Sequence, residues 1–314
     1  MPILYVVLPC YNEEAVLPET TKRLTEKLTD MINKGVCGEK SRILYVDDGS
    51  KDKTWELIEK FHGENHLVSG VKLAHNRGHQ NALLAGLMTA KEHCDCAASM
   101  DADLQDDINV LDGFMEKFSE GCDVVYGVRS KRTTDTAFKR STAQGYYKFM
   151  KKLGVDLVYN HADCRLMSKR ALEALSDYRE VNLFLRGIVP HIGFKSDIVY
   201  FERAERFAGE SKYPLKKMLA FAFDGITSFS VKPLKLITSL GIFFSILSGL
   251  GLVAELIVSL CGITVASWLL AVSFVWLLGG IQLICLGVAG QYIGKIYSEV
   301  KARPRFLVEK FIND

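Results

Sequence analysis

The sequence predicts an α/β fold with a mostly parallel sheet, followed by an interfacial helix and two transmembrane helices. Short apolar runs alternate with stretches of helical periodicity from residue 3 to residue 127, and polar clusters follow four of these runs. No charged residue lies between Glu255 and Lys295. Alternating strands and helices imply a parallel sheet with helices on both faces, and long uncharged segments imply membrane helices.

The elements around the sheet can be assigned in chain order. We expect strands at residues 3–8, 42–46, 70–73, 97–100 and 123–127, and helices at 12–33, 81–92, 108–119, 141–153 and 169–178, with a further helix that starts at Asp52 or Thr54 and ends at about His62. Asn12 can cap the first helix, whose first turn holds Glu13 and Glu14 at the positive end of the helix dipole. Ligands bind beyond the carboxyl ends of parallel strands, so the polar clusters that follow the strands predict one shared site.

Two uncharged segments, residues 236–254 and 263–293, are each long enough to span a hydrocarbon core of about 30 Å. Lysines and arginines flank the pair but are absent between them, so the positive-inside rule places both termini in the cytoplasm. We therefore expect a multi-pass protein of the cell membrane. Its parts are a cytoplasmic catalytic domain over 1–212, an interfacial amphipathic helix over 213–232, a two-helix transmembrane hairpin over 233–294 and a cytoplasmic tail over 295–314.

Composition narrows the range of functions. The 314-residue chain has a formal net charge of +2, which gives no support for binding to nucleic acid. Its eight cysteines include no Cys-x-x-Cys pair and no zinc spacing, which is typical of reduced thiols in the cytosol. The N-terminus lacks a basic segment and its apolar run stops at Pro9, which predicts a strand rather than a signal peptide.

Asp101 and Asp103 form an Asp-x-Asp motif directly after the apolar run 97–100. Mg²⁺ is usually held by one or two carboxylates together with substrate phosphates, so this motif predicts a metal-bridged phosphate site. A solvated turn is the alternative interpretation, because aspartate is common in turns. The other motifs along the chain favour the metal site.

Seven motifs occur in order along the chain. They are Pro9–Glu14, Val46–Thr54, Asn76–Gln80, Met100–Asp106, Gly127–Arg132, Asp163–Ser168 and Arg206–Tyr213. The set resembles the inverting family 2 glycosyltransferases, and within them the polyprenyl-phosphate branch of dolichol-phosphate mannose synthases and bactoprenol glucosyltransferases. The segment Gln291–Pro304 is similar to the bacterial members with two membrane helices.

This resemblance implies a GT-A nucleotide-binding domain, a nucleotide-sugar donor, and Mg²⁺ or Mn²⁺ as cofactor. The implied reaction is inverting transfer of one sugar to undecaprenyl or another polyprenyl phosphate on the cytoplasmic face of the membrane. The lipid-linked sugar would serve a cell-envelope polysaccharide. UDP-glucose is the first expectation for the donor, with UDP-N-acetylhexosamine and GDP-mannose as alternatives. A homo-oligomer, with a tetramer as one form, is also implied.

The resemblance also assigns roles to residues. Asp163, Asp101 and Asp103 are the expected catalytic residues, and Asp101, Asp103 and Gln105 the expected metal ligands. The donor nucleotide is expected at Pro9, Tyr11, Glu13, Asp47, Asp48, Arg77, His79, Asp101 and Ala102. The donor diphosphate and the lipid phosphate are expected at Arg129, Arg132, Arg165, Arg206, Ser211 and Lys212.

Asp163 matches the position proposed as the catalytic base of the family. A phosphate monoester has a second pKa of about 6, so a lipid phosphate is already largely dianionic at neutral pH. Asp163 can therefore orient Arg165 or the sugar instead of removing a proton.

Two other functions can be compared with that of a polyprenyl-phosphate glycosyltransferase. A processive polysaccharide synthase would need more membrane helices and a Gln-x-x-Arg-Trp segment, and the sequence has neither. A catalytically silent membrane subunit of a lipid-sugar export system would not need the Asp-x-Asp motif or the basic motifs, which are intact here.

Overall fold

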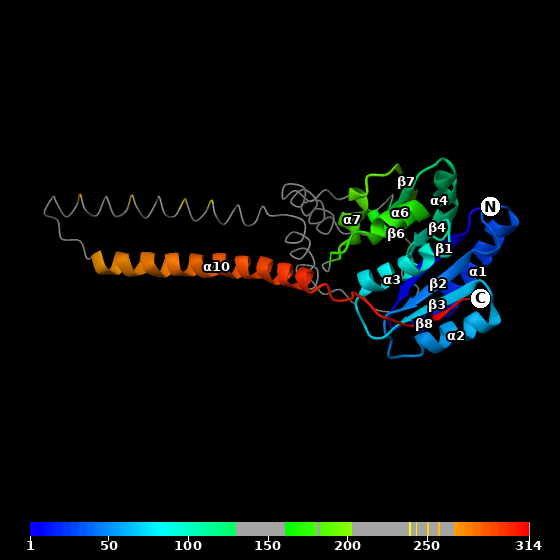
Figure 1. Ribbon diagram of the computed structural model, residues 1–314, viewed down its shortest axis with the longest axis horizontal. Coiled ribbons are helices and arrows are strands. Elements are labelled where there is room, and N and C mark those ends of the chain that lie inside the picture. Colours follow the sequence, from blue (N-terminus) through cyan, green and yellow to red (C-terminus); the bar gives the residue numbers. More distant parts are fainter. Residues whose placement is uncertain are drawn as a thin grey trace. The chain divides into compact units, whose positions relative to one another are not determined.

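The computed structural model describes residues 1–129, 161–180, 183–202, 239, 243, 250, 257 and 267–313. The chain divides into two compact units. The first unit contains every described strand and most of the helices, and the second contains the long helix α10 (Ser267–Lys301) (Figure 1). The two units are considered separately below.

The first unit is built on a sheet with the strand order β7-β5-β6-β4-β1-β2-β3-β8. The strands are β1 (Leu4–Cys10), β2 (Arg42–Asp47), β3 (Val68–Leu73), β4 (Cys96–Ser99), β5 (Val124–Arg129), β6 (His161–Ser168), β7 (Ser196–Phe201) and β8 (Val308–Ile312). β1 is parallel to β2 and β4, β2 to β3, and β5 to β7. β6 is antiparallel to β4 and β5, and β8 to β3. The expected α/β fold with a mostly parallel sheet is therefore confirmed.

Helices cover both faces of this sheet (Figure 1). The helices α1 (Leu17–Asn33), α2 (Thr54–Glu64) and α4 (Val110–Ser119) share one hydrophobic core with alternate residues of β1, namely Leu4, Val6 and Leu8. The intervening Val7 faces α3 (His79–Lys91), because successive strand residues point to opposite faces. Both sides of β1 are thus buried, which explains why its sequence is a continuous apolar run.

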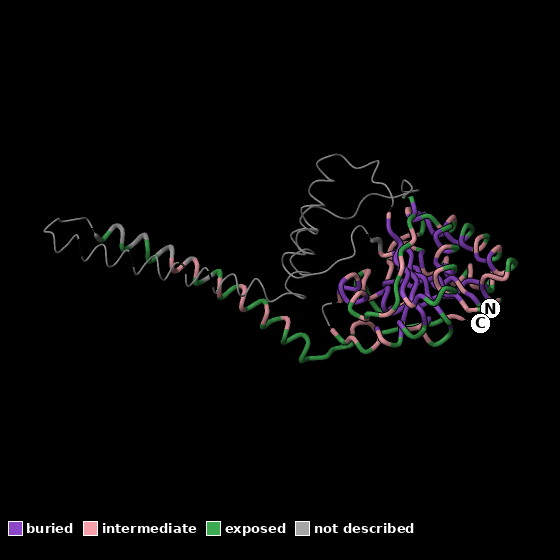
Figure 2. Tube along the Cα trace, turned by 90° about the horizontal axis from the view of Figure 1, so that it is seen from above, coloured by how far each residue is buried: buried purple, intermediate pink, exposed green. Residues whose placement is uncertain are grey.

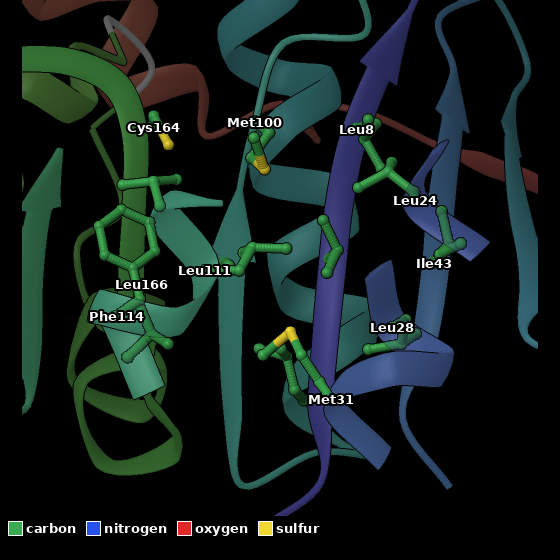
Figure 3. Close-up of a cluster of buried hydrophobic side chains, with 14 of the residues drawn as sticks. Leu8, Leu24, Leu28, Met31, Ile43, Met100, Leu111, Phe114, Cys164 and Leu166 are labelled. Carbon is green, nitrogen blue, oxygen red and sulfur yellow. The ribbon is translucent and has the colours of Figure 1, made fainter. Parts of the chain in front are cut away.

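The core lies between the sheet and the layer formed by α1 and α4. Figure 3 shows Leu24 and Leu28 of α1 and Phe114 of α4 directed toward the strands. Buried residues concentrate along the strands, while the outer faces of the helices are exposed (Figure 2). This rigid centre holds the strand ends, and the loops that follow them, in place.

The first helix begins at Leu17 and not at residue 12 as the sequence suggested. Asn12 has a φ of 54°, and its side-chain oxygen accepts the Lys51 backbone N–H at 2.8 Å, so it joins two loops instead of capping a helix. Val16 is the N-cap residue, and Pro18 lies in the first turn, where its missing N–H is tolerated.

Four of the elements that the structure describes were not predicted from the sequence: β6, α7 (Leu185–His191), β7 and β8. The expected helices at 52–62, 81–92, 108–119 and 169–178 correspond to α2, α3, α4 and α6 (Lys169–Ser176). The expected helix at 141–153, the interfacial helix over 213–232 and nearly all of the segment 236–254 lie outside the described residues.

The strand β8 comes from the end of the chain and closes one edge of the sheet. The Asn313 side-chain oxygen accepts from the Ser69 hydroxyl at 2.6 Å and from the Tyr5 hydroxyl at 3.3 Å. An ion pair between Lys310 and Glu59 joins β8 to α2. Because β8 pairs with β3, fewer backbone N–H and C=O groups of β3 are left without a hydrogen-bond partner.

The second unit is represented mainly by α10. Its described side chains include highly exposed apolar residues such as Val275, Ile284 and Leu286. Within the part of the chain that the structure describes, no helix meets both requirements for crossing a membrane, which are sufficient length and sufficient apolar character.

Candidate functional site

Four loops meet at the carboxyl ends of β1, β2, β3 and β4, as the sequence predicted. The loop after β1 contacts the loop after β2 through Asn12 and Lys51. The loop after β2 contacts the loop after β3 through Asp48 and Arg77. The start of α3 contacts the loop after β4 through His79 and Asp101. These hydrogen bonds therefore connect the four loops to one another along one edge of the sheet.

Asp48 organises the loop that leads into α3. Its two carboxylate oxygens accept the backbone N–H groups of Arg77 at 2.7 Å and Gly78 at 2.8 Å. Burial raises the pKa of Asp48, and these two N–H groups oppose that rise. Gly78 has a φ of 85°, a left-handed conformation that glycine adopts without strain. The side chain of Asp48 thus holds the backbone that presents His79.

Asp47 and Asp48 adopt different roles although they are adjacent. The Asp47 carboxylate is fully buried and accepts the Ser50 backbone N–H at 3.2 Å. Gly49, between Asp48 and Ser50, has a φ of 66°, and a Cβ there would lie 2.7 Å from the Asn76 backbone nitrogen. Glycine is needed where the two loops approach so closely. Contacts of Asp47 and Asp48 with the base and ribose stay a prediction.

The other residues expected at the nucleotide follow β1. Pro9 lies opposite Val46 in the β1–β2 pair. Tyr11 and Glu13 are half-buried in the loop beyond it, and the Glu13 backbone N–H donates to the Thr54 hydroxyl at 2.9 Å. The structure therefore places Pro9, Tyr11 and Glu13 beside the loop that carries Asp48.

The Asp-x-Asp loop follows β4 directly. Thr20 of α1 donates its hydroxyl to the Ala102 carbonyl at 2.9 Å, which fixes the loop from behind. Asp103 accepts the Gln105 backbone N–H at 3.1 Å, and Leu104 between them has a φ of 57°. Asp103 is nearly buried, whereas the Asp101 side chain is 33% exposed. The side chain of Asp101 is therefore more exposed to solvent than that of Asp103.

His79 is the first residue of α3, and its Nε2 lies 3.1 Å from Asp101 Oδ1. Burial alone would lower the pKa of His79, but the hydrogen bond and the charge of Asp101 outweigh it and raise the pKa. The start of α3 is therefore joined to the Asp-x-Asp loop by a side-chain contact, and the contact of His79 with the donor stays a prediction.

A carboxylate–arginine pair joins the segment after β4 to the end of β5. Asp106 is buried, and one of its oxygens accepts from Arg129 Nη2 at 3.0 Å. Its other oxygen, Oδ2, has no hydrogen-bond partner among the described residues. Burial raises the pKa of Asp106 to about 6 even though Arg129 opposes the change. Arg129 is therefore positioned at the site by a group that sequence reasoning did not single out.

A metal ion would be held in an open site here and not in a closed protein cage. Among the described residues, no group of three or more His, Cys, Asp or Glu side chains is arranged to hold a metal. Asp101 and Asp103 share one loop, and the charges of both contribute to the raised pKa of Asp106. Two carboxylates completed by substrate phosphates are a usual Mg²⁺ arrangement, so the residues fit that ion.

Asp163 lies in β6 between two arginines. Arg186 of α7 donates to both of its oxygens, from Nε at 2.9 Å and from Nη2 at 2.8 Å. Arg165 Nη2 approaches the same carboxylate at 3.2 Å. Burial would raise the pKa of Asp163, but Arg186 and Arg165 outweigh it and hold the pKa well below its ordinary value. Asp163 is therefore a paired carboxylate anion.

Arg165 was expected at a phosphate, but its side chain is only 2% exposed. It faces Asp163 and the Leu185 carbonyl, which it approaches at 3.3 Å. The side chain of Arg165 is therefore shielded from solvent and contacts Asp163 from within the protein. Four other residues expected at phosphates, Arg132, Arg206, Ser211 and Lys212, lie outside the described residues.

Arg186 was missed by the sequence analysis. It is the one charged residue in the apolar segment Leu183–Val189. An isolated charge in such a segment indicates a buried partner, because an unpaired charge is costly to bury. That signal alone could have marked Arg186, although it could not have identified Asp163 as its partner.

The comparisons with known proteins extend over most of the chain. The sequence profile of "Glycosyl transferase family 2" matches residues 5–176. The chain is 56% identical to the uncharacterized glycosyltransferase YkoT of Bacillus subtilis, covering 98% of this chain and 91% of that protein. It is 37% identical to the SfII prophage-derived bactoprenol glucosyl transferase of Shigella flexneri, covering 97% of both chains. It is 36% identical to a prophage bactoprenol glucosyl transferase homolog of Escherichia coli, covering 97% of this chain and 98% of that protein.

Proposed function

The chain belongs to glycosyl transferase family 2 and is a glycosyltransferase, and we propose that it transfers one sugar from a nucleotide sugar to a polyprenyl phosphate. The observation that carries this proposal is the joined edge of four loops. It brings carboxylates suited to a divalent cation, Asp101 and Asp103, to the same end of the sheet as Asp48. Relatives named bactoprenol glucosyl transferases support a lipid acceptor.

The proposed reaction is an in-line displacement. An oxygen of the lipid phosphate forms a bond to the anomeric carbon of the sugar, while the bond from that carbon to the donor diphosphate breaks. The nucleoside diphosphate leaves with the bonding electron pair, and the configuration at the anomeric carbon inverts. No proton has to be removed, because the attacking phosphate is already largely ionised at neutral pH.

The chain's own residues bind and orient the reactants in this scheme. Asp101, Asp103 and Gln105 would hold Mg²⁺ or Mn²⁺, which neutralises the charge that develops on the leaving diphosphate. Asp48 holds the loop of Arg77 and Gly78 beside the nucleotide. His79 keeps Asp101 in a defined position. Arrangement of charges before reaction reduces the reorganisation needed in the transition state.

The membrane part of the proposal rests on the sequence. The uncharged segments 236–254 and 263–293, with basic residues on their outer sides only, support a two-helix hairpin with the catalytic unit and both termini in the cytoplasm. The exposed apolar side chains of α10 are compatible with a lipid environment. The segment 213–232 would lie in the interface and bring the site to the lipid headgroup.

UDP-glucose is the first candidate for the donor, because several relatives carry the name bactoprenol glucosyl transferase. UDP-N-acetylhexosamine and GDP-mannose are the alternatives. A catalytically silent subunit of a lipid-sugar export system is disfavoured by the intact carboxylates Asp101 and Asp103 and by the paired Asp163.

Transfer from radiolabelled UDP- and GDP-sugars to undecaprenyl phosphate tests the proposal. The full chain in detergent is assayed with Mn²⁺, with Mg²⁺ and with a chelator. One labelled lipid that disappears with the chelator is the expected result, and its label identifies the sugar. Folded protein that binds UDP or GDP but labels no lipid would rule out this acceptor, and absence of nucleotide binding would favour the silent subunit.

A further inference from the structure

We propose that Gln80 is a positioning residue of the transfer site, whose side chain fastens the start of α7 to the start of α3. This inference rests on the proposed function and adds a residue to it. Its basis is the hydrogen bond from the Leu185 backbone N–H to Gln80 Oε1, at 3.1 Å, which joins positions 105 residues apart. Gln80 ends the motif Asn76–Gln80 and has no role in the metal, nucleotide or phosphate contacts expected from the sequence.

The first residue of α7 needs a hydrogen-bond acceptor from outside its own helix. The first N–H groups of a helix have no acceptor within it, and side chains commonly supply one. α7 begins at Leu185, and its N-cap residue Phe184 makes no side-chain capping hydrogen bond. Leu185 is buried, so the loss of its acceptor would leave a donor poorly satisfied. The amide oxygen of Gln80 therefore supplies a cap that the sequence of α7 lacks.

The backbone of Leu185 is held from a second side by β6. Its carbonyl accepts from Arg165 Nη1 at 3.3 Å, and Nη2 of the same guanidinium contacts Asp163 at 3.2 Å. The next residue, Arg186, contacts both oxygens of Asp163. A displacement of Leu185 would therefore move the guanidinium groups that hold Asp163 in place.

The first two residues of α3 contact different parts of the site. His79 contacts Asp101 in the loop after β4, and Gln80 contacts α7. Consecutive side chains of a helix point about 100° apart, so one helix turn can face both partners. The charges of Asp163 and Arg186 both act on the pKa of His79, the first raising it and the second lowering it. The start of α3 therefore links the Asp-x-Asp loop to the segment that holds Asp163.

Two carboxylates expected to take part in transfer, Asp101 and Asp163, are thus held relative to each other through Gln80. Reaction rates fall steeply when groups that act together are displaced, by about a hundredfold for a shift of 1 Å. Two interpretations compete with a positioning role. The hydrogen bond of Gln80 can serve only the stability of α7, or the Gln80 NH₂ group can itself bind the donor, and the measurements below separate the three.

Two variants and one control isolate the amide oxygen. Gln80→Leu removes the amide and keeps a side chain of similar size, whereas Gln80→Glu keeps an oxygen that can accept the Leu185 N–H and lacks the NH₂ donor. The matched control is Asn65→Ala. The Asn65 amide accepts the Leu67 backbone N–H at 3.0 Å and donates to the Thr25 hydroxyl at 2.9 Å, but it precedes β3, at the end of the sheet away from the site.

The first measurement is hydrogen–deuterium exchange of the full chain in detergent, read on the peptide that contains α7. Gln80→Leu should make this peptide exchange about fivefold faster, as the loss of one hydrogen bond predicts. Gln80→Glu should keep the exchange rate within about twofold of the unaltered chain. Asn65→Ala should leave the exchange of α7 unchanged.

The second measurement is sugar transfer with Mn²⁺, together with the affinity for UDP and GDP. In Gln80→Leu, kcat/KM for undecaprenyl phosphate should fall about tenfold or more, because Asp163 is displaced. Nucleotide affinity should stay within about twofold, since Asp48 and the Asp-x-Asp loop keep their own contacts. Gln80→Glu should recover most of the lost kcat/KM, and Asn65→Ala should change neither quantity.

The proposal is overturned if exchange of α7 is unchanged in folded Gln80→Leu, or if exchange rises while kcat/KM stays within about twofold of the unaltered chain. It is also overturned if Gln80→Glu loses as much kcat/KM as Gln80→Leu, or if both weaken nucleotide binding, because the NH₂ group is then the one that matters. If Gln80→Leu does not fold, Gln80→Asn decides in its place, since its amide is one methylene shorter. Nucleotide binding without any lipid product from the unaltered chain would contradict the proposed function and leave the exchange measurement intact.

Discussion

Single residues at the site are held by backbone groups as often as by other side chains. Asp48 accepts two N–H groups, Asp103 accepts one, and Asp47 accepts one from its own turn. Carboxylates used in this way define loop shape, so their replacement affects both structure and chemistry. Asp101 and Asp163 differ from them, because their described side-chain contacts are with His79 and with two arginines.

Asp103→Ala should abolish sugar transfer and leave the fold intact. Asp103 is expected to bind the metal directly, and its carboxylate accepts the Gln105 backbone N–H within the same loop. We expect a loss of at least about a hundredfold in kcat, comparable with removal of one electrostatic stabiliser. Asp107→Ala in the same loop is the control. Undiminished turnover of Asp103→Ala would refute the metal assignment.

Asp163 should contribute to stability in a pH-dependent way. Its pKa is lowered from 3.8 by Arg186 and Arg165, so its contribution is present above pH 3.8 and is lost as the pH falls below that value. At pH 7, Asp163→Asn leaves the buried Arg165 without the counter-charge of Asp163, which should cost about 3–5 kcal/mol. Thermal unfolding of the full chain followed by circular dichroism measures the difference.

Glu19→Gln is the control for this experiment. It breaks an exposed i,i+4 pair with Arg23 and should cost about 0.3–0.5 kcal/mol. The gap between Asp163→Asn and the unaltered chain should narrow as the pH is lowered through 3.8. A gap that is the same at pH 3 and pH 7 would contradict the lowered pKa of Asp163.

At the scale of elements, α3 connects the sheet to the site. Gly86 on its inner face allows the helix to lie directly on β1 and β2, because a Cβ there would come within 2.4 Å of Val7 and 2.5 Å of Val46. The N-terminal residue of the same helix is His79, which contacts Asp101. Packing at the middle of α3 therefore sets the position of a site residue at its end.

Gly86→Ala should destabilise the protein by about 1–3 kcal/mol and weaken donor binding, because the added methyl pushes α3 away from the sheet. Gly63→Ala is the matched control in α2, where a Cβ meets nothing within 4 Å. It should stabilise by about 0.5–1 kcal/mol, since alanine has the higher helix propensity. Equal effects of the two substitutions on Tm and on donor KM would show that α3 packing does not control the site.

On the scale of the whole molecule, the chain leaves the catalytic unit and returns to it. Residues before 203 form most of the sheet, and β8 near the end of the chain pairs with β3. If the proposed hairpin spans the membrane, the catalytic unit is attached to it on both sides. This double attachment would restrict the distance between the site and the lipid headgroup. The homo-oligomer implied by the resemblance stays a prediction.

Cysteine labelling tests the proposed topology. The described cysteines of the first unit, Cys10, Cys37, Cys94, Cys96, Cys122 and Cys164, are all buried. Cys261 falls between the two uncharged segments and is expected on the outer side of the membrane. A membrane-impermeant maleimide added to intact cells should label this chain, and Cys261→Ser should remove the label from it. Labelling of Cys261 that requires permeabilised cells would reverse the assigned orientation.

Much of the site could be predicted because its residues follow strands that are recognisable locally. The apolar runs that became β1, β2 and β4 end next to Pro9, Asp48 and Asp101. Parallel strands place such ends at one edge, so convergence follows from the pattern alone. The start of α1 was misplaced, since Asn12 bonds to a loop 39 residues away and not to the next turn of its own segment.

The sequence by itself determined the α/β class and the edge of the sheet at which the loops with Asp48 and Asp101 meet. These depend on periodicity and on the order of neighbours in the chain. Only the tertiary structure decided that β6 lies antiparallel between β4 and β5, that β8 closes the sheet, and that Asp163 is paired with Arg186. Those pairings join segments far apart in sequence, and many alternative partners of similar chemistry compete until packing of the whole unit selects one.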